Sequence, residues 1–184
     1  MKRLLSLLLT VYISACMSAQ SRPATVASLE HDYLLSYITM ENGLTNNYID
    51  DVYKDNNGFV WIVTYGGGLL RYDGYGFLKY NINSLPFSIK SNFVKKVCED
   101  NYGRLWVASE GGLDLIDLKT MSTSAIPSAD DALSKYVHRG TYMLYNDAHG
   151  CLWVSTDNTV EKLEFDAEGK VIKVHELTSA NMST

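Results

Sequence analysis

The sequence predicts an all-β fold made of about three four-stranded antiparallel blades of an incomplete β-propeller. A repeated motif is the first observation behind this prediction. In each copy Gly follows Asp after three residues and Trp follows Gly after three more, and the tryptophans are 45 and 47 residues apart. Propeller blades typically repeat a tryptophan marker about every 40–50 residues. The motif residues are Asp55, Gly58, Trp61, Asp100, Gly103, Trp106, Asp147, Gly150 and Trp153.

The hydrophobic pattern of the strand that carries each Trp is the second observation. Successive side chains of a strand point to opposite faces of its sheet, yet residues 59–63 are all apolar, and residues 105–108 and 152–154 behave alike. A sheet with one wet face would show alternation. We therefore expect each sheet to be packed between two neighbours, with its Trp buried against the next blade in a structural role.

Residues 1–20 have the pattern of a secretory signal peptide. A basic start at residues 2–3 precedes an apolar run over residues 4–13, which is too short for a comfortable membrane span. Two cleavage sites are possible for this segment. Simple cleavage, for instance after Ala19, is favoured over a lipoprotein-type cleavage that would leave a lipidated Cys16. Either way we expect a periplasmic chain, free or lipid-anchored.

The rest of the chain is divided by turn residues. Residues 31–40 are expected to form an extra strand, of the kind that completes the last blade of a closed ring. The expected segments are a signal peptide at 1–20, a linker at 21–30, the extra strand and its turn at 31–44, blade 1 at 45–83, blade 2 with its flanking connections at 84–134, and blade 3 at 135–184.

Within the blades, Asn, Asp and Gly mark the hairpin turns because they tolerate the positive φ that such turns demand. The third repeat has Asn158 and Thr159 where the others have a glycine pair, and Asn still permits the turn conformation. The expected strands are 48–54, 59–65, 69–72 and 77–81 in the first repeat, and 93–99, 105–109, 113–118 and 122–126 in the second. The third repeat starts near residue 136 and is expected to contain strands 152–156, 160–165 and 171–177.

Charge and cysteine content exclude several functions. The net charge is -5 and the chain has no basic run, so no nucleic-acid contact is expected. Export permits a disulfide between Cys98 and Cys151. However, the two residues occupy different positions in their repeats, which favours two small buried thiols.

No catalytic or metal-binding arrangement is evident. The four histidines are scattered without metal-ligand spacing. The Asp residues of the motif are interpreted as turn formers. An EF-hand reading that starts at Asp55 fails because Gly66 stands at the twelfth position. The chain is therefore expected to have no catalytic residue, no metal and no cofactor.

The best candidates for a ligand site lie in the loops that enter the first strand of each blade and join its second strand to its third. These loops share one edge of the blades. Their amides and tyrosines suit sugar hydroxyls, although such residues are also ordinary in loops. The candidates are Asn46, Asn47, Tyr48, Tyr65, Ser91, Asn92, Glu110, Arg139, Asp157 and Asn158.

Three segments of the first repeat, 42–45, 55–62 and 67–74, resemble the two-component regulator propeller repeat. The second repeat matches well, whereas the third departs from the pattern at residues 158–159. The resemblance implies the periplasmic sensor region of a hybrid two-component histidine kinase of Bacteroidetes type. In that family the ligands are largely glycan breakdown products, and the output is transcriptional regulation through a kinase downstream of a membrane helix.

Three blades do not close a ring, since propellers use about four to eight. The favoured interpretation is therefore an N-terminal fragment of such a sensor, itself not an enzyme. Its partners would be a small glycan-type ligand, the remaining blades and the downstream kinase of the parent chain. Alternatives are a homodimer that completes the ring, an exported glycan- or protein-binding (lipo)protein, and, less favoured, a propeller lyase or lactonase.

Overall fold

The computed structural model describes residues 36–128, 133 and 139–177 of the chain. From Tyr37 onward these residues belong to one compact unit. The predicted signal peptide, Cys16, the linker and the first half of the predicted extra strand lie outside the described residues.

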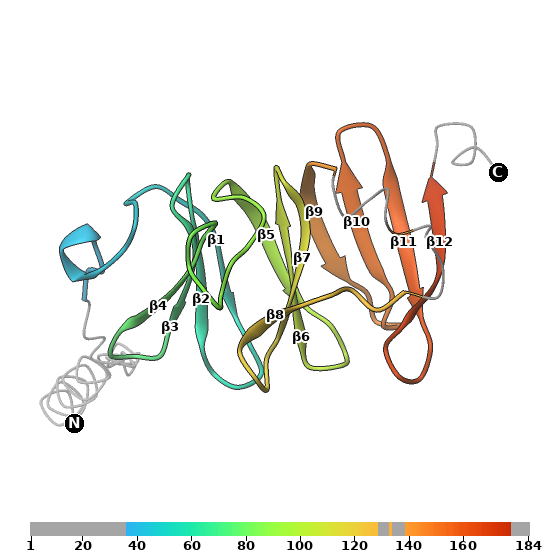
Figure 1. The fold of residues 1–184 in the computed structure, drawn as a ribbon, viewed down its shortest axis with the longest axis horizontal. Coiled ribbons are helices and arrows are strands. Elements are labelled where there is room, and N and C mark those ends of the chain that lie inside the picture. The colour runs from blue at the N-terminus through green and yellow to red at the C-terminus, as the bar shows by residue number, and fades with distance from the viewer. Residues whose placement is uncertain (1–35, 129–132, 134–138, 178–184) are drawn as a thin grey trace, which may run out of the picture. The chain divides into compact units, whose positions relative to one another are not determined.

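The described residues form three four-stranded antiparallel sheets (Figure 1), which confirms the predicted all-β, propeller-type fold. We call them the first, second and third blade. The first contains β1 (Ile49–Lys54), β2 (Val60–Thr64), β3 (Gly68–Tyr72) and β4 (Phe77–Tyr80); the second β5 (Val94–Glu99), β6 (Arg104–Ser109), β7 (Gly112–Asp117) and β8 (Ser122–Ser124); the third β9 (Thr141–Asn146), β10 (Leu152–Thr156), β11 (Val160–Phe165) and β12 (Val171–Leu177).

The predicted strand over residues 31–40 is wrong in the half that the structure describes. Residues 36–39 are irregular, and Met40–Asn42 form a single 3-10 turn, η1. Thr39 caps this turn, because its hydroxyl accepts a hydrogen bond from the Glu41 amide while its own amide donates to Asn42 Oδ1. Such local side-chain bonds offer the backbone an alternative to a strand ladder.

The loop between β10 and β11 also differs from expectation. Asn158 does not adopt the predicted turn conformation, which requires a positive φ. Among the described non-glycine residues, only Met121 has a positive φ. Instead the Thr156 amide donates to the Thr159 carbonyl at 2.9 Å, and the two Thr hydroxyls are 2.8 Å apart. In the first blade a glycine is required at this turn, since a Cβ on Gly68 would lie 2.4 Å from the Tyr80 carbonyl oxygen.

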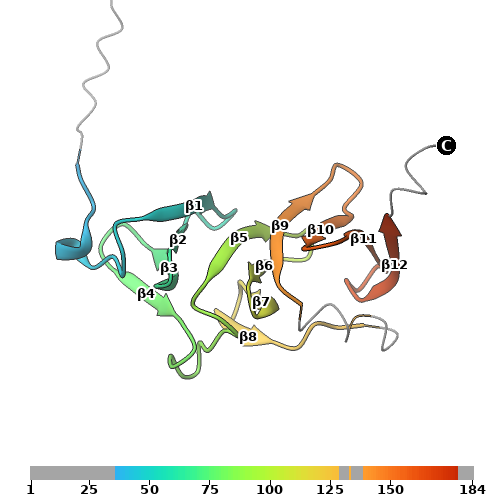
Figure 2. The same cartoon turned by 90° about the horizontal axis from the view of Figure 1, so that it is seen from above.

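The three blades pack in chain order, with the first strands β1, β5 and β9 along one side in Figure 2. One apolar core lies between the first and second blades and includes Trp61. Another lies between the second and third blades and includes Trp106. Both tryptophans are 0% exposed, as predicted, whereas Trp153 of the third blade is only half-buried, so the prediction that each Trp packs against a next blade is wrong for Trp153.

The Asp of each motif forms the predicted turn and also anchors its Trp. One carboxylate oxygen accepts a hydrogen bond from the backbone amide four residues later. The other oxygen accepts from the indole Nε1 six residues later, at 2.7 Å for Trp61 and 2.8 Å for Trp106 and Trp153. The anchor fixes the indole within its own repeat.

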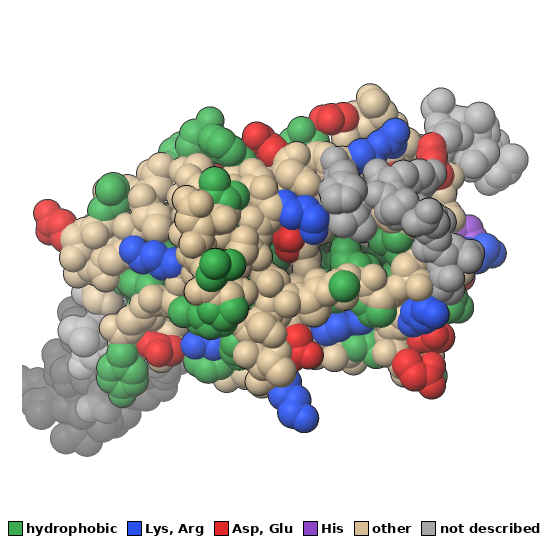
Figure 3. Space-filling view, viewed as in Figure 1, with side chains coloured by type: hydrophobic (Ala, Val, Ile, Leu, Met, Phe, Trp, Pro, Cys, Tyr) green, Lys and Arg blue, Asp and Glu red, His purple; other side chains and the backbone are tan. Residues whose placement is uncertain are grey.

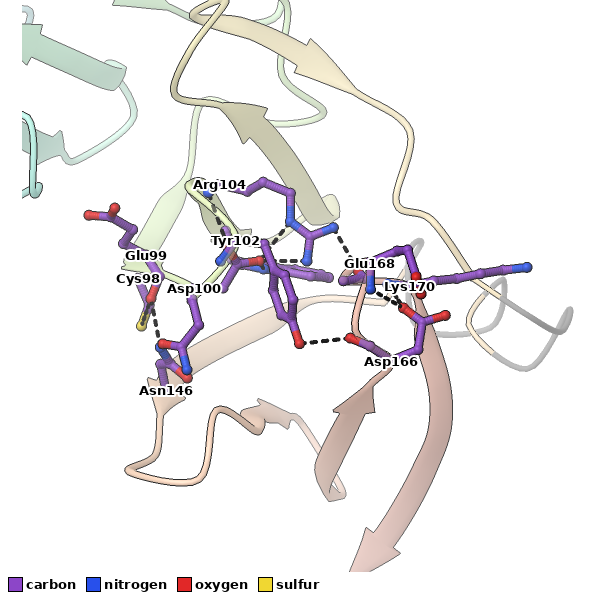
Figure 4. A network of polar contacts seen from close by, with 12 residues as sticks. Cys98, Glu99, Asp100, Tyr102, Arg104, Asn146, Asp166, Glu168 and Lys170 are labelled. Carbon is purple, nitrogen blue, oxygen red and sulfur yellow. Dashed lines mark hydrogen bonds and ion pairs between the residues drawn. The ribbon is translucent and has the colours of Figure 1, made fainter.

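A polar network adds to the apolar contact between the second and third blades (Figure 4). Arg104 pairs with Asp100, its Nε donating to Oδ2 at 2.8 Å, and its Nη1 donates across the junction to the Gly169 carbonyl at 2.8 Å. The Tyr102 hydroxyl donates to the Asp166 carbonyl at 2.8 Å. Arg104 and Asp100 are buried, so the pair is shielded from water and joins the two blades.

Candidate functional site

The predicted ligand-binding loops lie at the edge toward which the arrow of β10 points in Figure 1. At this edge a hollow of about 410 Å³ is lined by Tyr48, Asp50, Tyr65 and Lys95. Tyr48 and Tyr65 are among the predicted residues. Asp50 and Lys95 are not, so the structure adds a charged pair of side chains to the candidate site.

Aromatic rings form one wall of the hollow. Tyr65 is in edge-to-face contact with Tyr48 on one side and with Phe93 on the other, with both centroid distances 5.7 Å. Tyr48 is 66% exposed and Tyr65 50% exposed. Exposed aromatic rings held in place by neighbours present an apolar face and a polar tip to a ligand at little entropic cost.

A cation with a carboxylate partner lies beside these rings. Lys95 Nζ lies 3.0 Å from Glu110 Oε1 and 5.7 Å from the centroid of the Tyr65 ring. The hydrogen bond to Glu110 raises the pKa of Lys95, and burial opposes this only in part. Lys95 is therefore an ammonium that is already paired.

The charged residues reach the hollow because of a β-bulge. The register between β1 and β2 shifts between Ile49 and Asp51, so Asp50 is the extra, unpaired residue. The same shift between Val94 and Lys96 makes Lys95 the extra residue of β5. A bulge re-aims its side chain out of the regular alternation, and bulges are common next to functional sites.

The third blade repeats this device with Tyr142. In the pairing of β9 with β10, Thr141 and Met143 oppose consecutive residues, which leaves Tyr142 extra. A hydrogen bond to Asp157 raises the pKa of Tyr142, and charges on Glu110 and Lys95 also act on it. Tyr142 therefore extends the line of polar side chains from the hollow toward the predicted residue Asp157.

The other predicted residues of the first two blades build the loops. Asn46 bridges the Tyr65 carbonyl, at 2.8 Å, and the Tyr48 amide, at 2.9 Å. Side-chain oxygens of three further residues accept backbone N–H groups: Asn47 from Met40, Asn92 from Ile82 and Ser91 from Phe93. These residues position the rings and strands around the hollow rather than lining it.

Arg139 and Asn158 are exposed in the third blade and do not line the hollow. The role of all ten predicted residues in ligand binding stays a prediction. A sequence signal could have found the three missed residues, because Asp50, Lys95 and Tyr142 each stand five residues before the Asp of the motif.

No described group of three or more His, Cys, Asp or Glu side chains could hold a metal ion. Cys98 and Cys151 are free thiols, both half-buried, and burial raises the pKa of Cys98. In the face shown in Figure 3, Lys and Arg side chains lie among Asp and Glu side chains rather than in one patch. Within the described segments, no helix has the length and apolar character needed to cross a membrane.

The fold and the repeats are those of a β-propeller. The chain carries the two-component regulator propeller repeat, whose family model matches residues 43–66 and 88–111. This confirms the resemblance inferred from the motifs. A search of the curated proteins found no match.

Solved structures support the same relation. The extracellular domain of the hybrid two-component system BT3049 from B. thetaiotaomicron is 27% identical, with a TM-score of 0.62 over 76% of this chain and 20% of that one. The extracellular domain of BT4673, described as a one-component system of the same organism, is 22% identical, with a TM-score of 0.62 over 80% of this chain and 21% of that one. The second likeness concerns the fold alone. The chain spans about a fifth of the length of each structure.

Proposed function

We propose that the chain is part of the periplasmic sensor domain of a hybrid two-component system and binds a small glycan-derived ligand without catalysing a reaction. The single observation that carries this proposal is the hollow at the loop edge, which is lined by Tyr48 and Tyr65 together with Asp50 and Lys95. The similarity to extracellular domains of two-component systems supports the signalling role.

The chemistry of the hollow suits a saccharide. Half-exposed Tyr rings can cover the apolar face of a pyranose, while carboxylate, ammonium and phenol groups exchange hydrogen bonds with its hydroxyls. A volume of about 410 Å³ falls within the range of small-ligand sites, which is roughly 300–1,000 Å³. Two blades contribute to the hollow, so a bound ligand would contact both and could bias how they pack against each other.

The parent protein would carry the signal. BT3049 is named as a hybrid two-component system, and a histidine kinase is accordingly the partner expected downstream of this sensor. Further blades of the parent chain would be the immediate neighbours of the described sheets. A homodimer is the alternative way to cover the outer blade faces.

A binding measurement with a substitution in the aromatic wall tests the proposal. Tyr65→Ala should weaken the binding of small oligosaccharides at least tenfold in isothermal titration calorimetry, because the stacking ring is lost. Tyr75→Ala is the matched control, since Tyr75 is fully exposed in the turn between β3 and β4, at the opposite edge. Saccharide binding that Tyr65→Ala leaves unchanged, or no binding to any oligosaccharide tested, would contradict the proposal.

A further inference from the structure

The charges at the hollow are not balanced. The residues that line it contribute one carboxylate, Asp50, and one ammonium, Lys95. Glu110 adds a second carboxylate through its contact with Lys95 at 3.0 Å. Asp50 also acts electrostatically on Lys95. Two carboxylates therefore share one ammonium, and the group carries one net negative charge.

The ammonium of Lys95 is committed to partners within the chain. Its side chain is 23% exposed and that of Glu110 is 47% exposed, and the Tyr65 ring lies beneath Nζ at 5.7 Å. An anionic ligand would have to displace Glu110 from Lys95 or bind beside two carboxylates. Like charges placed together in this way cost enough free energy to exclude a wrong partner.

The neighbouring charges do not relieve this imbalance. Lys96, the next residue of β5, pairs with Asp51 at 2.7 Å, so that ion pair is neutral by itself. Farther along the same edge, Asp157, which is hydrogen-bonded to Tyr142, and the exposed Arg139 add one charge of each sign and leave the balance as it is. Among the described residues that line the hollow, Lys95 is the one cation.

An uncharged saccharide meets no such penalty. Its hydroxyls can donate to Asp50 and Glu110 and accept from Lys95, so every charged group keeps or gains a hydrogen bond. We propose that the hollow takes an uncharged saccharide and rejects the uronic-acid counterpart of the same sugar, with the Lys95–Glu110 pair as the selecting element. This proposal rests on the proposed function of the hollow as a glycan site and adds the charge class of the ligand.

Matched saccharides provide the test. We would titrate the purified chain with galactose- and glucose-type oligosaccharides and with galacturonate- and glucuronate-type oligosaccharides of the same length. These ligands differ only at C6, where a hydroxymethyl group is replaced by a carboxylate. The wild-type chain should bind one of the neutral ligands at least tenfold more tightly than its uronate counterpart.

A substitution then identifies the selecting element. Glu110→Gln removes one carboxylate and frees the Lys95 ammonium, so the preference for the neutral ligand should fall at least threefold. Glu168→Gln is the matched control, because Glu168 is an exposed carboxylate in the turn between β11 and β12, at the opposite edge. This control should leave the preference unchanged.

The results separate the charge selection from the proposed glycan-binding function. Equal or tighter binding of the uronates by the wild-type chain overturns the charge selection and leaves the glycan function standing. A preference that Glu110→Gln does not reduce overturns the role of the Lys95–Glu110 pair. If no saccharide of either kind binds, the proposed function fails and the charge selection fails with it.

Discussion

The second and third blades carry the same motif but bury it differently. Trp106 and Trp153 both donate to the Asp of their motif at 2.8 Å. All six residues of β6 are buried, whereas β10 alternates between buried and half-buried residues. Trp106 is 0% exposed, while Trp153 lies half-buried on the face away from the second blade. The expectation that residues 152–154 are buried on both faces is therefore wrong for one face.

The motif sets the geometry within a blade, whereas the neighbouring blade sets how deeply the Trp is buried. Leu115 pairs with Trp106, and Lys162 occupies the equivalent position beside Trp153. Lys162 Nζ lies 5.9 Å from the Trp153 ring and 3.4 Å from Glu164, which also contacts His175 at 3.0 Å. On the outward face of the third blade Trp153 therefore lies between the exposed Tyr145 of β9 and the charged side chains of β11 and β12.

Removing each indole should give the largest contrast. Trp106→Ala should lower the free energy of unfolding by about 3–5 kcal/mol, because it leaves a cavity in a core filled from both sides. Trp153→Ala should cost about 1–2 kcal/mol, since this ring transfers less area from water. Urea denaturation of both variants measures the difference. Equal losses would mean that the outward face of the third blade is buried in solution.

The Arg104 junction should give an intermediate effect. Arg104→Met keeps the apolar stem but removes the bonds to Asp100 and Gly169, and should lower the free energy of unfolding by about 2–3 kcal/mol. Lys162→Met, which removes the partly exposed cation beside Trp153, is the matched control and should leave stability nearly unchanged. The same denaturation experiment applies. A stable Arg104→Met chain would show that the apolar core alone joins the two blades.

The acid response should give the smallest effect. Hydrogen bonds from the Trp153 indole, the Cys151 amide and the His149 amide lower the pKa of Asp147 below 3.8. A carboxyl whose folded pKa is lowered stabilises the fold above its unfolded pKa, and this contribution disappears as the pH falls through the folded pKa.

Asp147→Asn should therefore melt at a lower temperature than the wild type at pH 7. The gap between the two chains should narrow steadily as the pH falls below about 4, near the unfolded pKa of Asp. Thermal melts from pH 7 to pH 2.5 follow this gap. The melting temperature of Glu168→Gln should differ from that of the wild type by the same amount at every pH. A difference between Asp147→Asn and the wild type that stays constant with pH would contradict the proposed stabilisation by the ionised Asp147 carboxylate.

Much of the fold is predictable because its determinants are local. The strand bounds follow from Asn, Asp and Gly turns, and β10, β11 and β12 begin and end where the sequence predicts. The Asp147–Trp153 bond joins residues six apart. By contrast, Arg104 bonds to Gly169, 65 residues later, and no local pattern specifies that pairing.

The sequence predicts only those residues of the candidate site whose positions follow from the order of the strands. Tyr48 and Tyr65 were found because loop positions follow from the order of the strands. Asp50 and Lys95 were missed because strict alternation assigns each residue of a strand to one face, and a bulge breaks this rule. Glu110 was found, but its contact with Lys95 depends on that bulge.

The bulge at the start of each blade also bears on how such chains diversify. The extra residue is Asp50, Lys95 or Tyr142 in the three blades, an acid, a base and a phenol, while the paired strand beside it stays intact. Since the extra residue takes no part in the ladder, selection can exchange its side chain without disturbing the sheet. A lineage of such repeats could therefore acquire a new chemical preference through one substitution per blade, with its framework unaltered.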